Sequence, residues 1–419
     1  MEMFRHLHVP LQRQSYTSSD LPLLPLLPLL PLEEGFYVLP DIISKELSLN
    51  ELSLDSWYLI TRYLRTIELV PLLLTSYSVR MNILSSRRTI NVSLKKCIKP
   101  FFRTPSWKYQ NLGSLVTWVK SFPTLTVLKV HLDVDVSYKG SQIADLLAQP
   151  HLHTFEFTHK HDYYDYEYYK AYDDLHKNTI DVPPTVTRLK LSAAPSIINK
   201  LEVTNAITDL HLDFLRDPSG LADVDGSFTL DLPLVKLTLE GYIQISPQML
   251  SSLPRSLKKL ILIEVYVLPE FPWHEYIENL PSNLITFKFN TFTTDFHWTS
   301  SYSINILGKL PRSLLYLVWE ENDYGVKFRD DMLAYLPQKL IGFMASNCQY
   351  ITSTGIANLP RTLIWLNLVR ARLTRDSLPY MPQSLRTLYL SGDNKITPED
   401  VETLAPQIKT FRNVEAMIY

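Results

Sequence analysis

The sequence predicts a solenoid of the α/β class, with a parallel sheet on its concave face and short helices on its convex face. Three observations carry this prediction. A phrase of the form Leu-Pro-x-Ser-Leu begins at Leu253 and Leu310, with close variants at Leu359 and Met381. A phrase that returns at a near-constant interval is typical of one structural unit stacked many times. Each copy leads into alternating apolar residues, as in a strand with one buried face. A short segment with helix start signals precedes each copy.

The repeat register follows from the apolar pattern L-x-x-L-x-L. Its first residue recurs at intervals of 21 to 34 residues, and the longer intervals are expected to hold inserted loops. Side chains of a strand alternate between its two faces, so Leu260 and Leu262 are expected to point into the core. No repeat can bury its apolar face alone, so each is expected to depend on its neighbours. The twelve register positions are Leu125, Leu152, Val186, Ile207, Leu234, Leu257, Leu284, Leu314, Leu340, Leu363, Leu385 and Ile408.

Short helices are expected between the strands. Ser246, Ser303, Thr352, Thr374 and Thr397 are candidate N-caps, and proline follows the first and the last of them at the first helical position. The proline of each Leu-Pro pair removes a backbone donor and is expected to end the helix before it. The expected helices are 247–253, 274–280, 304–310, 330–336, 353–359, 375–381 and 398–404.

Over roughly its last three hundred residues the chain resembles leucine-rich repeat proteins, whose repeats run about 20–29 residues. The repeat that contains Asn347 and Cys348 resembles the cysteine-containing subtype, in which this pair closes the end of the strand. That subtype is associated with F-box proteins. The Leu-Pro phrase is also similar to FNIP repeats, although their Phe-Asn-x-Pro element is absent from this sequence.

Residues 50–92 show helical periodicity. Trp57, Ile60 and Leu64 recur at helical intervals. The region resembles an F-box, a small all-helical domain whose family pattern runs from L-P-x-E through I-x-x-Y-L and a D-L element to L-V-S-R-x-W-R. Ser53 stands where the family has proline, and Val79 stands where it often has tryptophan. The matching residues are Ile60, Tyr63, Leu64, Glu68, Leu69, Leu74, Thr75, Ser76 and Arg80.

The F-box resemblance implies that these helices bind a Skp-type linker and, through it, the cullin scaffold of a ubiquitin ligase. The chain would then be a substrate-recognition adaptor with no covalent chemistry of its own. The alternative is that the helices only cap the solenoid, since solenoids need caps, and that the chain is an interaction scaffold without ligase linkage. The residues expected to contact the linker are Leu52, Trp57, Ile60, Tyr63, Leu64 and Leu69.

The sequence thus divides into four parts. Residues 1–49 contain leucine-proline repetition between positions 21 and 32 and are expected to form a disordered arm. Residues 50–92 form the F-box-like domain, 93–112 a linker with several basic residues, and 113–419 the solenoid.

Composition excludes several classes of protein. The 41 basic and 43 acidic residues give a net charge of −2, which provides no general attraction to nucleic acid or to membranes. Two cysteines, Cys97 and Cys348, are too few for a secreted solenoid of this size, so a cytoplasmic location, with the nucleus as a second compartment, is expected. The segment from Met1 to His6 lacks the apolar core of a secretory signal, and no stretch of about 18 apolar residues is free of proline, so neither a secretory signal nor a membrane span is expected.

No catalytic motif stands out, so no enzyme activity and no cofactor are expected. The histidines at 151, 153, 159 and 161 lie on and beside a predicted strand and are expected to form a solvated strand edge rather than a metal site. The tyrosine-rich segment 161–174 is either a recognition loop or an acidic surface loop.

Outward strand residues line the concave face, the surface that repeat proteins use for binding. Tyr316, Trp365 and Tyr389 occupy nearly equivalent places in neighbouring repeats. They are either interface anchors or cross-strand packing that shields itself. The residues expected to contact a protein substrate are Lys259, Lys288, Tyr316, Trp365, Asn367 and Tyr389.

Overall fold

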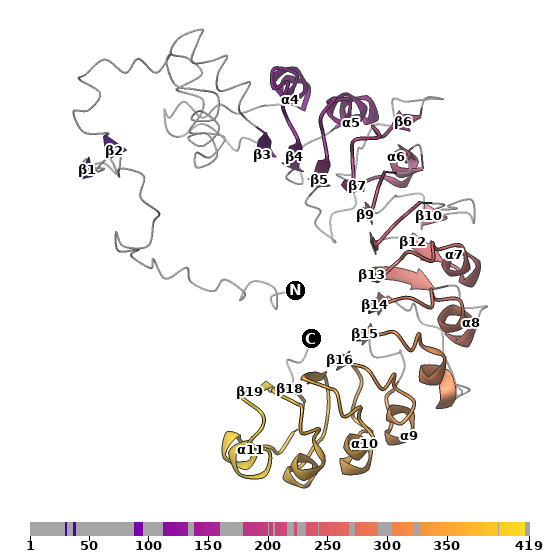
Figure 1. Ribbon diagram of the computed structural model, residues 1–419, viewed down its shortest axis with the longest axis vertical. Coiled ribbons are helices and arrows are strands. Elements are labelled where there is room, and N and C mark those ends of the chain that lie inside the picture. The colour runs from indigo at the N-terminus through magenta and orange to yellow at the C-terminus, as the bar shows by residue number, and fades with distance from the viewer. Residues whose placement is uncertain are drawn as a thin grey trace, which may run out of the picture.

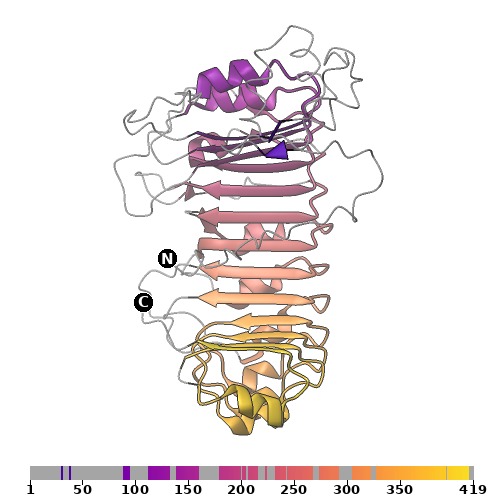
Figure 2. The same ribbon diagram turned by 90° about the vertical axis from the view of Figure 1, so that its left-hand side faces the viewer.

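The computed structural model describes residues 30–31, 37–38, 88–94, 112–132, 138–159, 179–199, 201–203, 206–215, 222–223, 232–241, 243–267, 273–291, 304–321, 327–392 and 394–414. The described residues from 88 onward form a curved ladder of strands with helices on its outer side (Figure 1). The strands lie side by side on the concave face (Figure 2). The expected α/β solenoid with a parallel sheet and short convex helices is therefore confirmed for this part of the chain.

The main sheet holds one parallel strand per repeat, in the order of the sequence. Each strand pairs with the strand of the next repeat, and a register shift within this path occurs after Leu262. The strands are β3 (Thr89–Leu94), β4 (Val127–Leu132), β5 (Thr154–His159), β7 (Arg188–Ala193), β9 (Asp209–Phe214), β11 (Lys236–Gly241), β13 (Lys259–Val267), β14 (Thr286–Thr291), β15 (Tyr316–Glu321), β16 (Gly342–Ala345), β17 (Trp365–Leu368), β18 (Thr387–Ser391) and β19 (Thr410–Val414).

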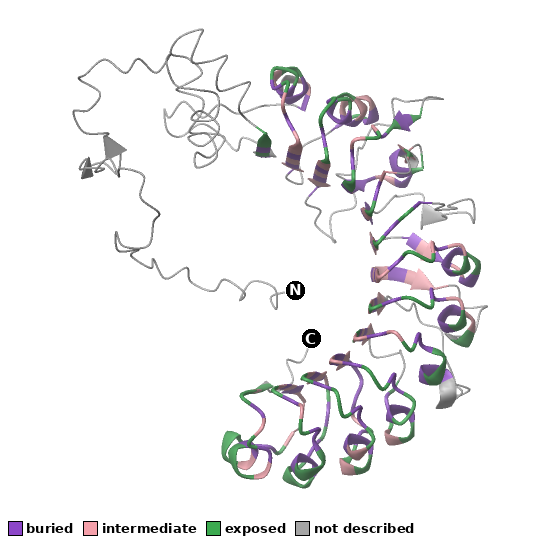
Figure 3. Ribbon diagram, in the orientation of Figure 1, coloured by how far each residue is buried: buried purple, intermediate pink, exposed green. Residues whose placement is uncertain are grey.

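The predicted register is confirmed in every repeat from β4 to β19. Each of these strands begins two residues after its predicted register position, as Val127 follows Leu125 and Thr410 follows Ile408. All twelve register residues belong to the buried core. Leu260 and Leu262 are both fully buried, as the alternation predicts. Buried residues fill the space between the sheet and the helices, whose outer surfaces are exposed (Figure 3).

The Leu-Pro phrase forms a tight turn that leads into the strand. In one copy the amide of Leu257 donates to the carbonyl of Pro254 at 3.0 Å, and in another the amide of Leu363 donates to the carbonyl of Pro360 at 3.2 Å. This is the hydrogen bond from residue i+3 to residue i that closes a β-turn. Proline is the first residue of this turn and disfavours a helical backbone for the leucine before it, so the helix ends there and the chain turns toward the strand.

The serine or threonine of the phrase joins each repeat to the one before it. The hydroxyl of Thr362 lies 2.6 Å from the carbonyl of Leu340 and 3.0 Å from that of Gln338. Ser384 makes the same contacts one repeat later, at 2.6 Å from the carbonyls of both Leu363 and Arg361. A hydroxyl side chain recurs at this place in the phrase, where it donates to a backbone carbonyl of the preceding repeat.

In five repeats of the described residues a left-handed residue lies five positions after the strand begins; in four of them it is at or just beyond the end of the strand, and in β13 it lies within the strand, where the pairing register shifts. Gly241 and Gly392 have φ of 90° and 114°, and the three residues that are not glycine have φ between 56° and 60°. Those three are Glu264, Asn347 and Arg370. The Asn-Cys pair does close the strand end as expected, and the amide of Cys348 donates to the carbonyl of Val369 at 3.1 Å.

All seven expected helical segments contain a helix or a 3₁₀ turn. Ser246 caps the first, accepting from the amide of Met249 at 3.1 Å, and Thr397 forms a capping box with Asp400. Thr374 makes no such contact through its side chain. The elements are α7 (Pro247–Ser251), α8 (Trp273–Glu278), η4 (Ile304–Lys309), α9 (Asp330–Leu333), α10 (Ser353–Ala357), η5 (Arg375–Tyr380) and α11 (Pro398–Leu404).

The N-terminal repeats vary more on their outer side. Three carry helices: α4 (Leu112–Val119), α5 (Gly140–Leu147) and α6 (Pro195–Ile198). Short parallel pairs also occur there, β6 (Ile180–Asp181) with β8 (Leu201–Glu202), and β10 (Ala222–Asp223) with β12 (Ile243–Ile245).

The expected boundaries near the N-terminus need correction. Strand β3 pairs in parallel with β4 over six residues, so the sheet begins before residue 113, and the expected boundary between 92 and 93 falls inside a strand. Ile90 and Val92 alternate into the core and are 0% and 8% exposed. This strand lacks the leading leucine phrase, which is why the register did not include it.

The rest of the N-terminal part is described only in small pieces. Within the expected arm, β1 (Leu30–Pro31) pairs antiparallel with β2 (Tyr37–Val38). Residues 50–87 and the tyrosine-rich segment 161–174 lie outside the described residues, and so does Cys97. In the described ranges, none of the helices has both the length and the hydropathy needed to cross a membrane.

The hydroxyl that joins two repeats can be removed almost isosterically. We expect Thr362→Val to lower the free energy of unfolding by about 1–2 kcal/mol, because two carbonyls of the preceding coil lose their donor. Thr410→Val is the control, since Thr410 is an exposed threonine at the start of a strand. Urea denaturation followed by circular dichroism measures both. Equal effects of the two substitutions would contradict the joining role.

The thiol of Cys348 is fully buried, and burial raises its pKa well above the ordinary value. Since the thiolate is the reactive species, we expect this thiol to be inert in the native protein. In a Cys97→Ser variant, iodoacetamide should label no cysteine before unfolding and label one fully in urea, as read by intact mass. Rapid labelling of the folded variant would show that the Asn-Cys corner is open.

Candidate protein-binding face

The outward residues of the main sheet form rows across the concave face, at the first, third and fifth positions of each strand. Backbone pairing places equivalent positions of neighbouring strands side by side, for example Tyr316 beside Gly342 and Gly342 beside Trp365. We call strands β3–β11 the N-terminal half of this face and strands β13–β19 the C-terminal half. The two halves carry different chemistry.

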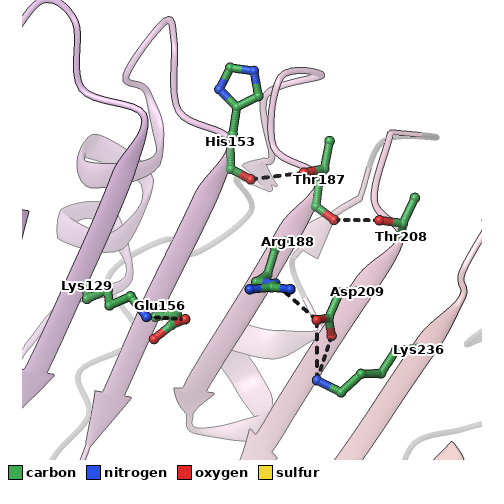
Figure 4. Close-up of polar contacts among 8 residues, drawn as sticks. All are labelled: Lys129, His153, Glu156, Thr187, Arg188, Thr208, Asp209 and Lys236. Atoms are coloured by element: carbon green, nitrogen blue, oxygen red, sulfur yellow. Dashed lines mark hydrogen bonds and ion pairs between the residues drawn. The ribbon is translucent and has the colours of Figure 1, made fainter. Parts of the chain in front are cut away.

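Cross-strand ion pairs occupy the N-terminal half (Figure 4). Nζ of Lys129 lies 2.8 Å from Oε1 of Glu156 on the next strand. Asp209 bridges two strands, at 3.1 Å from Arg188 on one side and 3.1 Å from Lys236 on the other. Each carboxylate is thus placed between basic groups by the strand spacing of about 4.8 Å.

Histidines extend this network. His211 lies 2.9 Å from Glu240. His131 lies 2.6 Å from the hydroxyl of Thr158, and burial lowers the pKa of His131 below its ordinary value, although nearby Glu156 acts in the opposite direction. At the three outward rows this half carries four basic and four acidic residues, so its charges balance. Six of these eight residues form ion pairs within the face: Lys129, Glu156, Arg188, Asp209, Lys236 and Glu240.

An aromatic pair dominates the C-terminal half. A Cβ atom on Gly342 would lie 2.7 Å from Cδ1 of Tyr316 and 3.1 Å from Cε3 of Trp365. The two rings therefore lean over the strand between them and occupy the space that a side chain would fill. Tyr316 is still 42% exposed. The rings of Tyr316 and Trp365 therefore cover Gly342, as expected for cross-strand packing, and Tyr316 also keeps part of its surface exposed.

The second outward row continues this surface. Asn367 pairs with Tyr389 in register, and the guanidinium of Arg412 lies 5.6 Å from the centre of the Tyr389 ring. Lys288 lies 3.1 Å from Glu320. All six residues expected to bind a substrate therefore lie on outward positions of β13–β18, and the structure brings Tyr316 close to Trp365 and Asn367 close to Tyr389. Their role in binding stays a prediction.

Sequence reasoning missed a row of aliphatic residues at the edge of the sheet, one position before each of the strands β14 to β17. Ile285 and Ile364 are 36% and 45% exposed, and Leu315 and Ile341 are half-buried between them. The signal was present in the sequence. Each of these residues directly follows a register leucine, and only one member of such a pair can point into the core.

The other candidate sites of the sequence lie apart from this face or outside the described residues. His151 and His153 are exposed, His159 is buried, and Nδ1 of His153 lies 2.8 Å from the carbonyl of His151. Within the described ranges, no group of three histidine, cysteine, aspartate or glutamate residues is placed to hold a metal ion. The residues expected to contact the linker, Leu52, Trp57, Ile60, Tyr63, Leu64 and Leu69, lie outside the described residues.

Comparisons with known proteins add little to this account. No protein-family model matches the chain, and no curated protein matches it. Among solved structures, the leucine-rich repeat-containing protein LegL7 from Legionella pneumophila is 14% identical, with a TM-score of 0.34, over 77% of this chain and 91% of its own. An internalin, InlF, from Listeria monocytogenes is 14% identical, with a TM-score of 0.38, over 84% of this chain and 88% of its own. Because both TM-scores are below 0.5, the fold is assigned from the strand register of this chain and not from its similarity to these two structures.

Asp209 provides a test of the ion-pair network. Its partners are partly exposed, so we expect Asp209→Asn to lower the free energy of unfolding by only about 0.5–1 kcal/mol at low salt. Raising the salt concentration should shrink the difference from the unmodified chain. Asp145→Asn, at an exposed pair with Lys120, should have a smaller effect. A large loss that salt does not change would contradict this view of the N-terminal half.

Proposed function

We propose that this chain is a protein-recognition module that binds a partner through the C-terminal half of its concave face. The observation that carries the proposal is the aromatic pair of Tyr316 and Trp365, held over Gly342 with part of its surface exposed. Aromatic residues on a preformed concave surface are typical interface anchors. In the N-terminal half most charged residues are engaged in ion pairs with one another and are less available to a partner.

We propose further that the recognised protein is a substrate of a cullin-type ubiquitin ligase and that the chain is its adaptor. Support comes from the sequence: the F-box resemblance between Ile60 and Arg80, and the cysteine-type repeat at Asn347 and Cys348. In this proposal the chain contacts a Skp-type linker through the N-terminal helices and performs no covalent chemistry itself.

A scaffold without ligase linkage is the second candidate. It is favoured by the strand β3, which extends the sheet to Thr89 and so starts the solenoid inside the stretch 50–92 that resembles an F-box. A solenoid end needs a cap, and the helices expected from the sequence before that strand are suitably placed in the sequence to provide one.

Binding to a purified Skp-type linker separates the two candidates. We expect the intact chain to retain the linker in a pull-down and Leu64→Ala or Trp57→Ala to weaken retention at least about ten-fold, the loss expected when an interface anchor is truncated. Trp365→Ala should retain the linker fully, because it lies on the far part of the solenoid, and serves as the matched aromatic control.

Circular dichroism and an unchanged unfolding midpoint must accompany each variant, so that loss of folding is not mistaken for loss of binding. If the folded, intact chain does not retain the linker, the ligase proposal is wrong and the scaffold remains. If the linker binds equally well to all variants, the contact lies elsewhere and the F-box assignment is wrong.

A further inference from the structure

An exposed apolar strip runs across four neighbouring strands of the C-terminal half. We define it as Ile285, Leu315, Ile341 and Ile364 at the sheet edge, together with the rings of Tyr316 and Trp365. Of the seven large apolar residues that are exposed in the described part of the chain, three belong to this strip. Contiguous exposure of this kind marks a contact surface rather than scattered surface residues.

Basic residues border the strip at both ends. Lys258 and Lys259 lie at the start of β13, on one side, and Arg386 lies directly before β18, on the other. Lys409 lies directly before β19, and Arg412 lies on it. From β13 to β19, the edge row and the first two outward rows hold six basic residues, Lys288 included, and no acidic residue. This excess stands out in a chain whose net charge is −2.

The spacing of these features fixes the length of a ligand. Strands β13 to β18 are consecutive neighbours in the sheet (Figure 2). Five steps of about 4.8 Å separate the basic groups at the two ends by about 24 Å. An extended peptide rises about 3.3 Å per residue, so about seven residues span that distance.

We propose that the strip is the docking site for an extended peptide of another protein, with an apolar centre and acidic residues at both ends, about seven residues apart. The apolar centre packs on the aliphatic row and on the two rings. The acidic ends meet Lys258 and Lys259 at one side and Arg386 at the other. This inference rests on the proposed function only in taking the C-terminal half as the recognition face.

The chemistry of the strip favours a peptide over a single-stranded nucleic acid. A nucleic acid needs basic groups along its whole backbone. The edge row and the first outward row carry no charge at all from Ile285 to Trp365, across four strands. A phosphate lying over Leu315 and Ile341 would lose hydration without gaining a partner.

Fluorescence polarisation with the full chain tests the proposal. The probe is a labelled synthetic peptide with two aspartates at each end of the core Leu-Tyr-Leu-Phe-Leu, and its comparison peptide has lysines in place of the aspartates. We expect the acidic peptide to bind at least about ten-fold more tightly, since opposite charges at both ends favour it and like charges oppose the other.

Charge reversal at the two ends provides the decisive variant. The double variant Lys259→Glu and Arg386→Glu should invert the preference, so that the lysine peptide binds better, and Ile364→Asp should weaken both peptides. Lys190→Glu is the matched control on β7 in the N-terminal half and should change neither affinity. Because all these positions are at least partly exposed, circular dichroism should show each variant folded.

Several outcomes would overturn the proposal. They are equal binding of the two peptides, no binding of either by the folded chain, a preference that the double variant leaves unchanged, or tighter binding of a thymidine decamer than of the acidic peptide. None of these results bears on the capture of a Skp-type linker, which the double variant should still perform. Loss of linker capture with intact peptide selectivity would instead reject the ligase role alone.

Discussion

Burial of alternate strand residues between neighbouring coils is the constraint on which the rest of the structure depends. The register residues of all twelve repeats lie in one continuous core, and none of the repeats could cover its own apolar face. Each buried leucine contributes about 1.5–3 kcal/mol relative to exposure, and the hydroxyl contacts of the Leu-Pro phrase add alignment between coils. The curvature and the concave face follow from this stacking.

Stacking constrains the inward positions and leaves the outward ones free to vary. In the N-terminal half, outward residues form ion pairs between neighbouring strands, and Asp209 bridges two basic neighbours. In the C-terminal half, a glycine at position 342 leaves room for the rings of Tyr316 and Trp365 to lean over it from the two neighbouring strands. A substitution at Gly342 would alter this surface without touching the core. The same stacked architecture thus supports an N-terminal half with cross-strand ion pairs and a C-terminal half with exposed aromatic residues.

The positions of the strands from β4 to β19 could be predicted from the sequence, because each strand begins two residues after its register residue. The strand β3 could not be predicted, since Ile90 and Val92 alternate without a leading leucine phrase before them. The exposed edge row was also missed, although the pairs Leu284-Ile285 and Leu363-Ile364 indicate it. The ring contact over Gly342 depends on side chains from three repeats, which no local pattern records. The aromatic and charged positions on the concave face were found because alternation alone assigns them outward.

Deletion of one whole repeat tests the stacking account most directly. Strands β17 and β18 begin at Trp365 and Thr387, so removal of residues 365–386 takes out one period of 22 residues and leaves β16 to pair with β18. The account predicts a folded protein with native-like circular dichroism and cooperative unfolding, whereas removal of half a period, residues 365–375, should abolish folding of the C-terminal half. If the whole-repeat deletion is as disruptive as the half-repeat deletion, the repeats are not interchangeable stacked units and the account is contradicted.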